Sequence, residues 1–344
     1  MSDRRGARTA KRFMVAALET LALLIVVVAL GCATYEEIGA WRDSRVLTQV
    51  GRSVDIGGRT LNISCAGEGS PTVIFDSGRT SPGYEWMPSQ RGVAAFTRAC
   101  WYDRAGIGWS GPGPDPSWGD SAARDLHLLV NRAGLSPPFV LVGASFGGYV
   151  IRFYQHMFPG EAVGMVFVDA ALEDAGTIEG IPHRERPQLP RSMIRALSIV
   201  GGHLGAVRMM ARDRGRAPKA WRPEEWDVLT RLLRQRKLLL ADAQVGPERA
   251  TADRVRATGG LENMPLIVLT QGRPLRDPSS PEASVRRGWV ALQRELAERS
   301  RFGRQVLVPN SGHGIPIEAP EAVVAAVRDI VQIVRRKHTT AASQ

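Results

Sequence analysis

A serine at position 145 lies between two glycines in a pattern that suits nucleophilic chemistry. The apolar run 139–144 precedes it, and the segment 149–156 that follows has a helical pattern. A strand, a tight turn and a helix are the setting in which G-x-S-x-G becomes a nucleophile elbow. Gly143 and Gly147 meet the steric demand of that turn, because a side chain at either position would clash. We therefore predict that Ser145 is a catalytic nucleophile.

A serine hydroxyl is a weak nucleophile at neutral pH and needs a base within hydrogen-bond reach. Of the six histidines, His313 lies in a glycine-flanked loop just after the last predicted strand, 304–309. In a parallel sheet that loop opens on the same edge as the elbow, where ligand sites gather. His127 and His156 fall inside helical patterns and are expected to pack or to face solvent. His313 is the predicted base.

A third group must fix the imidazole tautomer and stabilise its charged form, and this group is usually a carboxylate. Asp169 ends the strand that follows the elbow helix, so its side chain can emerge on the same edge. Asp277 lies in the loop after the next-to-last strand, several residues past Gly272. We favour Asp169 as the acid and keep Asp277 as the alternative.

Two backbone N–H groups are expected to stabilise the oxyanion that forms when the serine attacks a carbonyl. Phe146 provides one, because it follows the nucleophile at the start of a helix. The other is expected in the loop after the first long core strand, around Gly78 and Arg79.

Strands alternate with helices along most of the chain, which predicts a mostly parallel sheet with helices on both faces. The expected core covers residues 50–171 and 259–337. Between them, strand patterns vanish and amphipathic helical stretches appear, so residues 172–258 are expected to form a helical cap. Residues 338–344 form a predicted tail.

Several motifs, in this order along the chain, resemble those of the α/β-hydrolase superfamily. They are Asp76-Ser-Gly78, Tyr102-Asp-Arg-Ala-Gly-Ile-Gly-Trp-Ser110, Gly143-Ala-Ser145-Phe-Gly147, Val168-Asp169 and Ser311-Gly-His313. The resemblance covers about residues 52–337 and implies an eight-stranded sheet with the helical cap after the sixth strand. Leu275 stands where the family usually has its acid after the seventh strand, a departure that supports Asp169. The serine at the elbow argues against relatives with an aspartate nucleophile.

The N-terminus has the composition of a membrane anchor. A basic segment, 1–12, precedes an apolar run, 13–33, that is about long enough to cross a bilayer as a helix. The basic flank is expected to stay in the cytoplasm, which places the rest of the chain outside it. A short tether is predicted at 34–49. Cleavage, giving a secreted protein or a lipoprotein, is the alternative.

Cys65 and Cys100 are the two cysteines outside the apolar run, and a disulfide between them or two buried free thiols both fit the sequence. The family resemblance makes their strands neighbours in the sheet and so favours the disulfide. The net charge of +11 comes mostly from arginine, and no nucleic-acid-binding motif accompanies it. We expect no nucleic-acid partner, no metal and no cofactor.

Together these patterns predict a membrane-tethered serine hydrolase that cleaves a small acyl ester through an acyl-enzyme. An aminopeptidase, a thioesterase or a C–C hydrolase on the same fold is the alternative, since fold does not determine chemistry. A non-catalytic, hydrolase-like binding protein of the cell envelope is a further alternative. Substrate identity and oligomeric state are not predicted.

Overall fold

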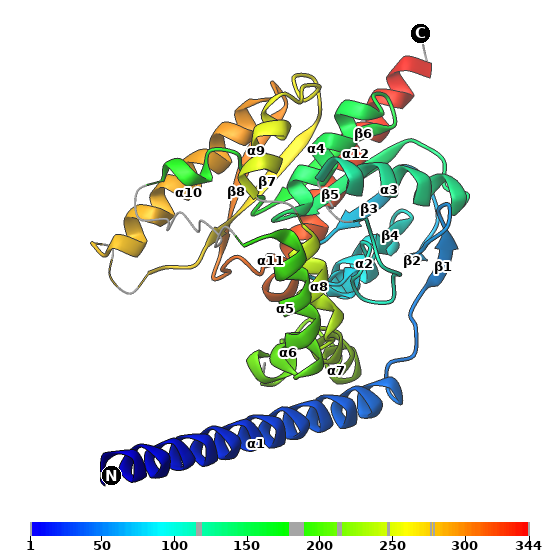
Figure 1. Cartoon of the computed structure of the whole chain (residues 1–344). Helices are drawn as coiled ribbons and strands as arrows, with labels where there is room; N and C mark the ends of the chain where they lie inside the picture. Colours follow the sequence, from blue (N-terminus) through cyan, green and yellow to red (C-terminus); the bar gives the residue numbers. More distant parts are fainter. Residues whose placement is uncertain are drawn as a thin grey trace.

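The structure is a computed structural model that describes residues 2–114, 119–178, 189–211, 215–245, 248–275, 277 and 279–342. A single eight-stranded sheet, in the order β1-β2-β4-β3-β5-β6-β7-β8, organises these residues (Figure 1). The strands are β1 (Arg52–Asp55), β2 (Thr60–Ala66), β3 (Thr72–Asp76), β4 (Ala99–Tyr102), β5 (Phe139–Ala144), β6 (Ala162–Val168), β7 (Leu266–Gly272) and β8 (Gly303–Pro309). Strand β2 pairs antiparallel with β1 and β4, and all other pairs are parallel.

The central strands are apolar on both faces, as a sheet covered by helices on both sides requires. Along β5, Phe139 and Leu141 belong to one buried cluster, whereas Val140 and Val142 belong to the other. Helices α3 (Gly119–Arg132), α4 (Gly147–Met157) and α10 (Pro281–Glu298) contribute to the first cluster. Helices α2 (Met87–Ala94) and α12 (Pro320–Ala342) cover the opposite face.

Between β6 and β7, the regular elements of the described residues are all helices, and they form the cap. They are η2 (Ala175–Thr177), α5 (Arg191–His203), α6 (Ala206–Met210), α7 (Pro223–Leu232), α8 (Lys237–Gln244) and α9 (Glu248–Arg256). Helix α8 meets the core where Leu238 and Ala241 pack against Ile107. The short helices η1 (Gly83–Trp86) and α11 (Ile315–Glu318) follow β3 and β8.

Helix α1 (Ser2–Ser44) is continuous, which differs from the tail and tether expected at its two ends. The expected apolar segment lies in its middle, and the window from Lys11 onward is apolar enough to cross a membrane. The segment expected as a tether, 34–49, is helical as far as Ser44, and its Glu36 and Asp43 bind arginines of the cap. Figure 1 shows α1 passing beneath α6 and α7.

The end of the chain also differs from its prediction. Helix α12 continues to Ala342 and so includes most of the tail expected at 338–344. Residues 343 and 344 lie outside the described residues.

A disulfide joins Cys65 of β2 to Cys100 of β4. The two residues are direct partners in the antiparallel register, so their side chains lie next to each other on the same face of the sheet. The remaining cysteine, Cys32, is free and lies within α1.

Candidate active site

Ser145 lies in a strained turn between β5 and α4. Its φ angle is 50°, a left-handed conformation that non-glycine residues rarely adopt and that gathers at functional sites. A β-carbon on Gly143 would lie 2.6 Å from the carbonyl oxygen of Gly147, and one on Gly147 would lie 2.6 Å from that of Asp76. The two glycines therefore allow the turn and its close approach to the end of β3.

Asp169 and His313 meet at the carboxyl edge of the sheet. The Nδ1 of His313 lies 2.6 Å from Oδ2 of Asp169, whose side chain is fully buried. Asp169 also has a positive φ angle, 44°, directly after β6. The N–H of Ser145 donates to the carbonyl of Val168, the residue before Asp169. The structure thus brings the predicted acid to the predicted base. The residue before this acid, Val168, is hydrogen-bonded to the elbow serine.

The alternative acid, Asp277, lies elsewhere. Its Oδ1 accepts hydrogen bonds from the N–H and the hydroxyl of Ser279, and it has no hydrogen bond to His313 within the described residues. These bonds lower the pKa of Asp277, as expected for an exposed carboxylate that stabilises a turn.

Two partners of Asp169 were not predicted from the sequence. Its Oδ1 accepts from the backbone N–H of Gln271 at 3.0 Å and from the indole Nε1 of Trp289 at 2.9 Å. The Trp289 ring also stands edge-to-face to His313, with ring centroids 6.4 Å apart. No local sequence pattern identifies Trp289 as a site residue, because a tryptophan in an amphipathic helix is usually interpreted as a core residue.

The electrostatics of the site favour the charged form of His313. The hydrogen bond to Asp169 raises the pKa of His313, and burial opposes it. The carboxylates of Glu85 and Glu318 add to the increase. Glu318 also holds the histidine loop, since its Oε2 accepts from the N–H of Gly312 at 2.7 Å.

The backbone N–H groups expected to act as oxyanion donors differ in their hydrogen bonding. The N–H of Gly78 donates to Oε1 of buried Glu85 at 3.3 Å, so it is already engaged. Within the described residues, the N–H groups of Arg79 and Phe146 have no hydrogen-bond acceptor. A β-carbon built on Gly78 would lie 3.8 Å from Cβ of Ser145, so this loop borders the nucleophile. The geometry supports Arg79 and Phe146 and removes Gly78.

A buried arginine supports the loop that carries Arg79. The guanidinium of Arg104 binds Oδ1 of Asp76 and the carbonyl oxygens of Ser77, Gly78 and Arg79. Burial raises the pKa of Asp76, and this increase exceeds the decrease caused by its ion pair with Arg104. One side chain therefore fixes three consecutive carbonyl groups beside the elbow.

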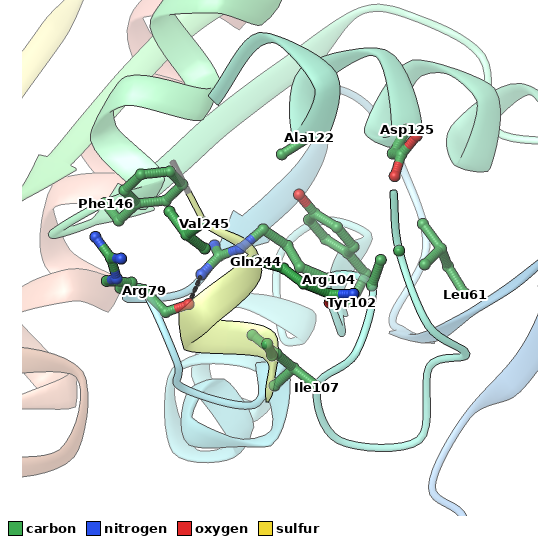
Figure 2. A pocket seen from close by; sticks show the side chains of 13 residues that line it. Leu61, Arg79, Tyr102, Arg104, Ile107, Ala122, Asp125, Phe146, Gln244 and Val245 are labelled. Atoms are coloured by element: carbon green, nitrogen blue, oxygen red, sulfur yellow. Dashed lines mark hydrogen bonds between the residues drawn. The ribbon is translucent and has the colours of Figure 1, made fainter. Parts of the chain in front are cut away.

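Figure 2 shows a narrow crevice next to this loop, with Phe146 and Arg79 at one end and Leu61 and Asp125 at the other. Its volume is about 20 Å³, enough for about one water molecule. Gln244 and Val245, at the end of cap helix α8, line it. The cap thus closes directly over the expected oxyanion donors.

The arrangement joins a strained serine, a histidine–carboxylate pair and two unengaged backbone N–H groups on one sheet edge. These are the parts that acyl transfer through a serine nucleophile needs. Among the described residues, no group of three or more histidine, cysteine, aspartate or glutamate side chains could hold a metal ion.

Comparisons with known proteins agree with this geometry. Residues 73–326 match the model of the alpha/beta hydrolase family. The chain is 22% identical over 264 residues to the uncharacterized protein YqjL of Bacillus subtilis, covering 77% of this chain and 85% of that protein. It is 26% identical over 293 residues to an AB hydrolase superfamily protein of Gibberella zeae, covering 77% and 87%.

Solved structures share the fold. A thermophilic esterase from Thermogutta terrifontis superposes with a TM-score of 0.57 at 22% identity, covering 82% of this chain and 98% of the esterase. The epoxide hydrolase CorEH gives a TM-score of 0.56 at 19% identity, covering 81% and 97%. At these identities the likeness concerns the fold alone.

Proposed function

The chain belongs to the alpha/beta hydrolase family, and we propose that it is a serine hydrolase that cleaves a carboxylic ester. The observation that carries this proposal is the contact between His313 and buried Asp169 on the edge where the elbow presents Ser145. The neighbours named as epoxide hydrolases share the fold, but a serine in the elbow favours acyl transfer over epoxide opening.

In the proposed mechanism, Ser145 attacks the ester carbonyl while His313 takes the hydroxyl proton. Asp169 accepts the Nδ1 proton of His313 in a hydrogen bond, which leaves Nε2 free to act as the base. His313 then returns the proton to the leaving alcohol, and the acyl group stays on Ser145. A water molecule, activated by the same histidine, releases the carboxylic acid and restores the serine.

The negative charge that develops on the carbonyl oxygen would be stabilised by the N–H groups of Phe146 and Arg79. Such donors act best when they are already oriented before reaction. Arg104 supplies that orientation for Arg79 through its bonds to the loop carbonyls.

We also propose that α1 anchors the protein in a membrane with its basic end in the cytoplasm. The candidate span is not buried against the rest of the protein, and four arginines and one lysine precede the apolar run 13–33. The Cys65–Cys100 disulfide supports an extracytoplasmic site for the hydrolase domain, because disulfides persist in oxidising compartments.

The proposal is tested with a panel of p-nitrophenyl esters and amino-acid anilides and the full-length protein in detergent. We expect ester hydrolysis that Ser145→Ala lowers by about 10³-fold or more. Turnover of the anilides alone would point to an aminopeptidase. No turnover of any substrate, with tight binding of one of them, would favour a binding protein.

A further inference from the structure

Helix α1 is attached to the cap by buried charges. Arg208 of α6 binds Oε2 of Glu36 at 2.9 Å and Oδ2 of Asp43 at 2.8 Å, and Arg231 of α7 binds Oδ1 of Asp43 at 2.9 Å. Glu36 is 1% exposed. Burial alone would lower the pKa of Arg208, but its bonds to Asp43 and Glu36 raise it overall. Because breaking a buried ion pair is costly, these contacts fix the cap relative to the apolar part of α1.

Apolar side chains are exposed on α5 and α6, two cap helices that contact α1. Five of them form a surface that we call the cap apolar face: Met193, Leu197 and Val200 of α5, and Met209 and Met210 of α6. The three on α5 follow helical spacing and so share one side of that helix. Tyr35 and Trp41 of α1 are half-exposed, and aromatic residues of this kind gather at membrane–water interfaces.

A groove of about 700 Å³ begins at this face, between α6, α7 and α8. Seven of its eleven lining residues are apolar, including Val207, Met210, Leu233 and Leu239. Met210 belongs to both surfaces and is 80% exposed. The volume lies in the range of pockets that hold small-molecule ligands, and the lining suits a hydrocarbon chain.

The groove also borders the loop that carries Arg79. Thr80, the residue after Arg79, lines it, and so does Asp242 of α8. The carboxylate of Asp242 binds Nε of Arg79 at 2.6 Å. The groove therefore connects the cap apolar face with the loop whose N–H is a proposed oxyanion donor.

We propose that this groove binds the acyl chain of a lipid ester taken from the membrane in which α1 is anchored. The chain enters past Met210 at the bilayer surface, and its ester group reaches Ser145 beside Thr80 and Arg79. The acyl group passes to Ser145, the alcohol part leaves with the proton of His313, and water then releases a fatty acid. This inference rests on the proposed function and on the anchor, and it names the substrate class for that site.

The binding step is tested without catalysis. The full-length Ser145→Ala protein is reconstituted in vesicles of phosphatidylethanolamine and phosphatidylglycerol that contain a phosphatidylglycerol with a diazirine on its acyl chain. After irradiation we expect cross-links on the peptides that contain Val207, Met210 and Leu239. Adding Met210→Asp, or Ala206→Trp to fill the groove, is expected to lower this cross-linking about tenfold, roughly the effect of losing the burial of two methylene groups.

Leu128→Asp is the matched control, because Leu128 is an exposed apolar side chain on core helix α3. It is expected to leave the cross-links unchanged. Because α1 lies in the same bilayer, cross-links on α1 are expected in every variant. The absence of cross-links on the groove peptides, or a yield on them that stays at the Ser145→Ala level in both groove variants, would overturn the inference. Met210 is so exposed that its substitution is expected to leave the fold intact. An unchanged cross-linking yield in Met210→Asp would therefore count against the groove.

The catalytic arm compares p-nitrophenyl decanoate with p-nitrophenyl acetate in the protein that carries Ser145. We expect a higher kcat/KM for decanoate in the wild type, and a lower decanoate-to-acetate ratio in Met210→Asp. Hydrolysis of both esters without groove cross-links would overturn this inference and leave the proposed function intact. Groove cross-links without hydrolysis of either ester would support the groove and overturn the proposed function.

Discussion

Among single residues, Asp169 uses both of its carboxylate oxygens in hydrogen bonds. Its two carboxylate oxygens accept from His313, Trp289 and the backbone of Gln271, and it has no exposed surface. A buried carboxylate with this many donors keeps one orientation, and it therefore fixes the tautomer of the histidine. His313 itself is more than half exposed, so its other nitrogen can reach a substrate.

The pH dependence of ester hydrolysis should reflect the protonation of His313 beside Asp169. The pKa of His313 is raised above its usual 6.5, and only the neutral imidazole can act as the base. We therefore expect kcat/KM to fall as the pH decreases through a midpoint above 6.5. Asp169→Asn removes the main cause of the increase, so it should move that midpoint lower and reduce kcat by about 10²- to 10⁴-fold.

Asp277→Asn is the control for this measurement, because the Asp277 side chain is exposed and, within the described residues, its carboxylate accepts hydrogen bonds from Ser279 alone. It should keep the wild-type rate and midpoint. A wild-type rate in Asp169→Asn would contradict the account.

The residues that the sequence predicts are those with a local signature. Ser145 stands in a motif whose glycines are explained by backbone sterics, and His313 follows the last strand in a glycine-flanked loop. Glu85 and Trp289 lack such a signature, because each acts through a tertiary contact that no local motif marks: Glu85 with the N–H of Gly78, and Trp289 with the distant Asp169. The engagement of Gly78 by Glu85 could not be predicted for the same reason.

At the scale of elements, a buried ion pair joins the elbow helix to the segment after β6. Arg152 of α4 is 2% exposed and binds Glu173 through two hydrogen bonds, of 2.6 and 3.2 Å. Arg299 binds the same carboxylate at 2.7 Å. Although burial raises the pKa of Glu173, the two arginines outweigh it and lower the pKa to about 2. This pair ties the helix that follows Ser145 to the chain that follows Asp169.

Arg152→Met should therefore destabilise the core. It leaves Glu173 buried with one partner, and we expect the free energy of unfolding to fall by about 3 kcal/mol. Chemical denaturation of the full-length protein in nonionic detergent measures the change. Arg124→Met is the matched control, since Arg124 is 59% exposed and its carboxylate partner, Asp120, also binds Arg254. The free energy of unfolding of the control should fall by less than about 1 kcal/mol. Equal losses in Arg152→Met and Arg124→Met would contradict the prediction.

The strands were easier to predict than the cap. Short apolar runs bounded by glycine and proline indicate buried strands, and the runs expected at 139–144 and 304–309 are β5 and β8 to within one residue. Helices α6, α8 and α9 were not individually predicted, because they are short and get their order from packing on neighbours. The last turns of α1 bind a cap arginine more than 160 residues away, a contact that no local pattern predicts.

Across the whole molecule, two kinds of link connect its parts. Ion pairs attach α1 to the cap, and the Arg79–Asp242 pair attaches the cap to the loop beside Ser145. The disulfide between Cys65 and Cys100 links the strands β2 and β4 within the core. A movement of α1 would thus be transmitted through the cap to the loop beside Ser145.

The disulfide gives a prediction for the intact protein. Alkylation of unreduced, denatured protein taken from membranes should modify one thiol, Cys32, and mass spectrometry counts the added groups. Replacing both Cys65 and Cys100 by serine should lower the free energy of unfolding by about 3 to 4 kcal/mol, because the loop they close is released in the unfolded state. Cys32→Ser should leave stability unchanged. Three modified thiols would contradict the disulfide.

The central claim is that Ser145 is an activated nucleophile, and covalent labelling tests it most directly. The full-length protein in detergent is treated with a fluorophosphonate probe, and the modified peptide is identified by mass spectrometry. We predict one label, on Ser145, that is absent from Ser145→Ala and much slower to form in His313→Ala. A folded wild-type protein that is not labelled, or one labelled equally after Ser145→Ala, would contradict the account.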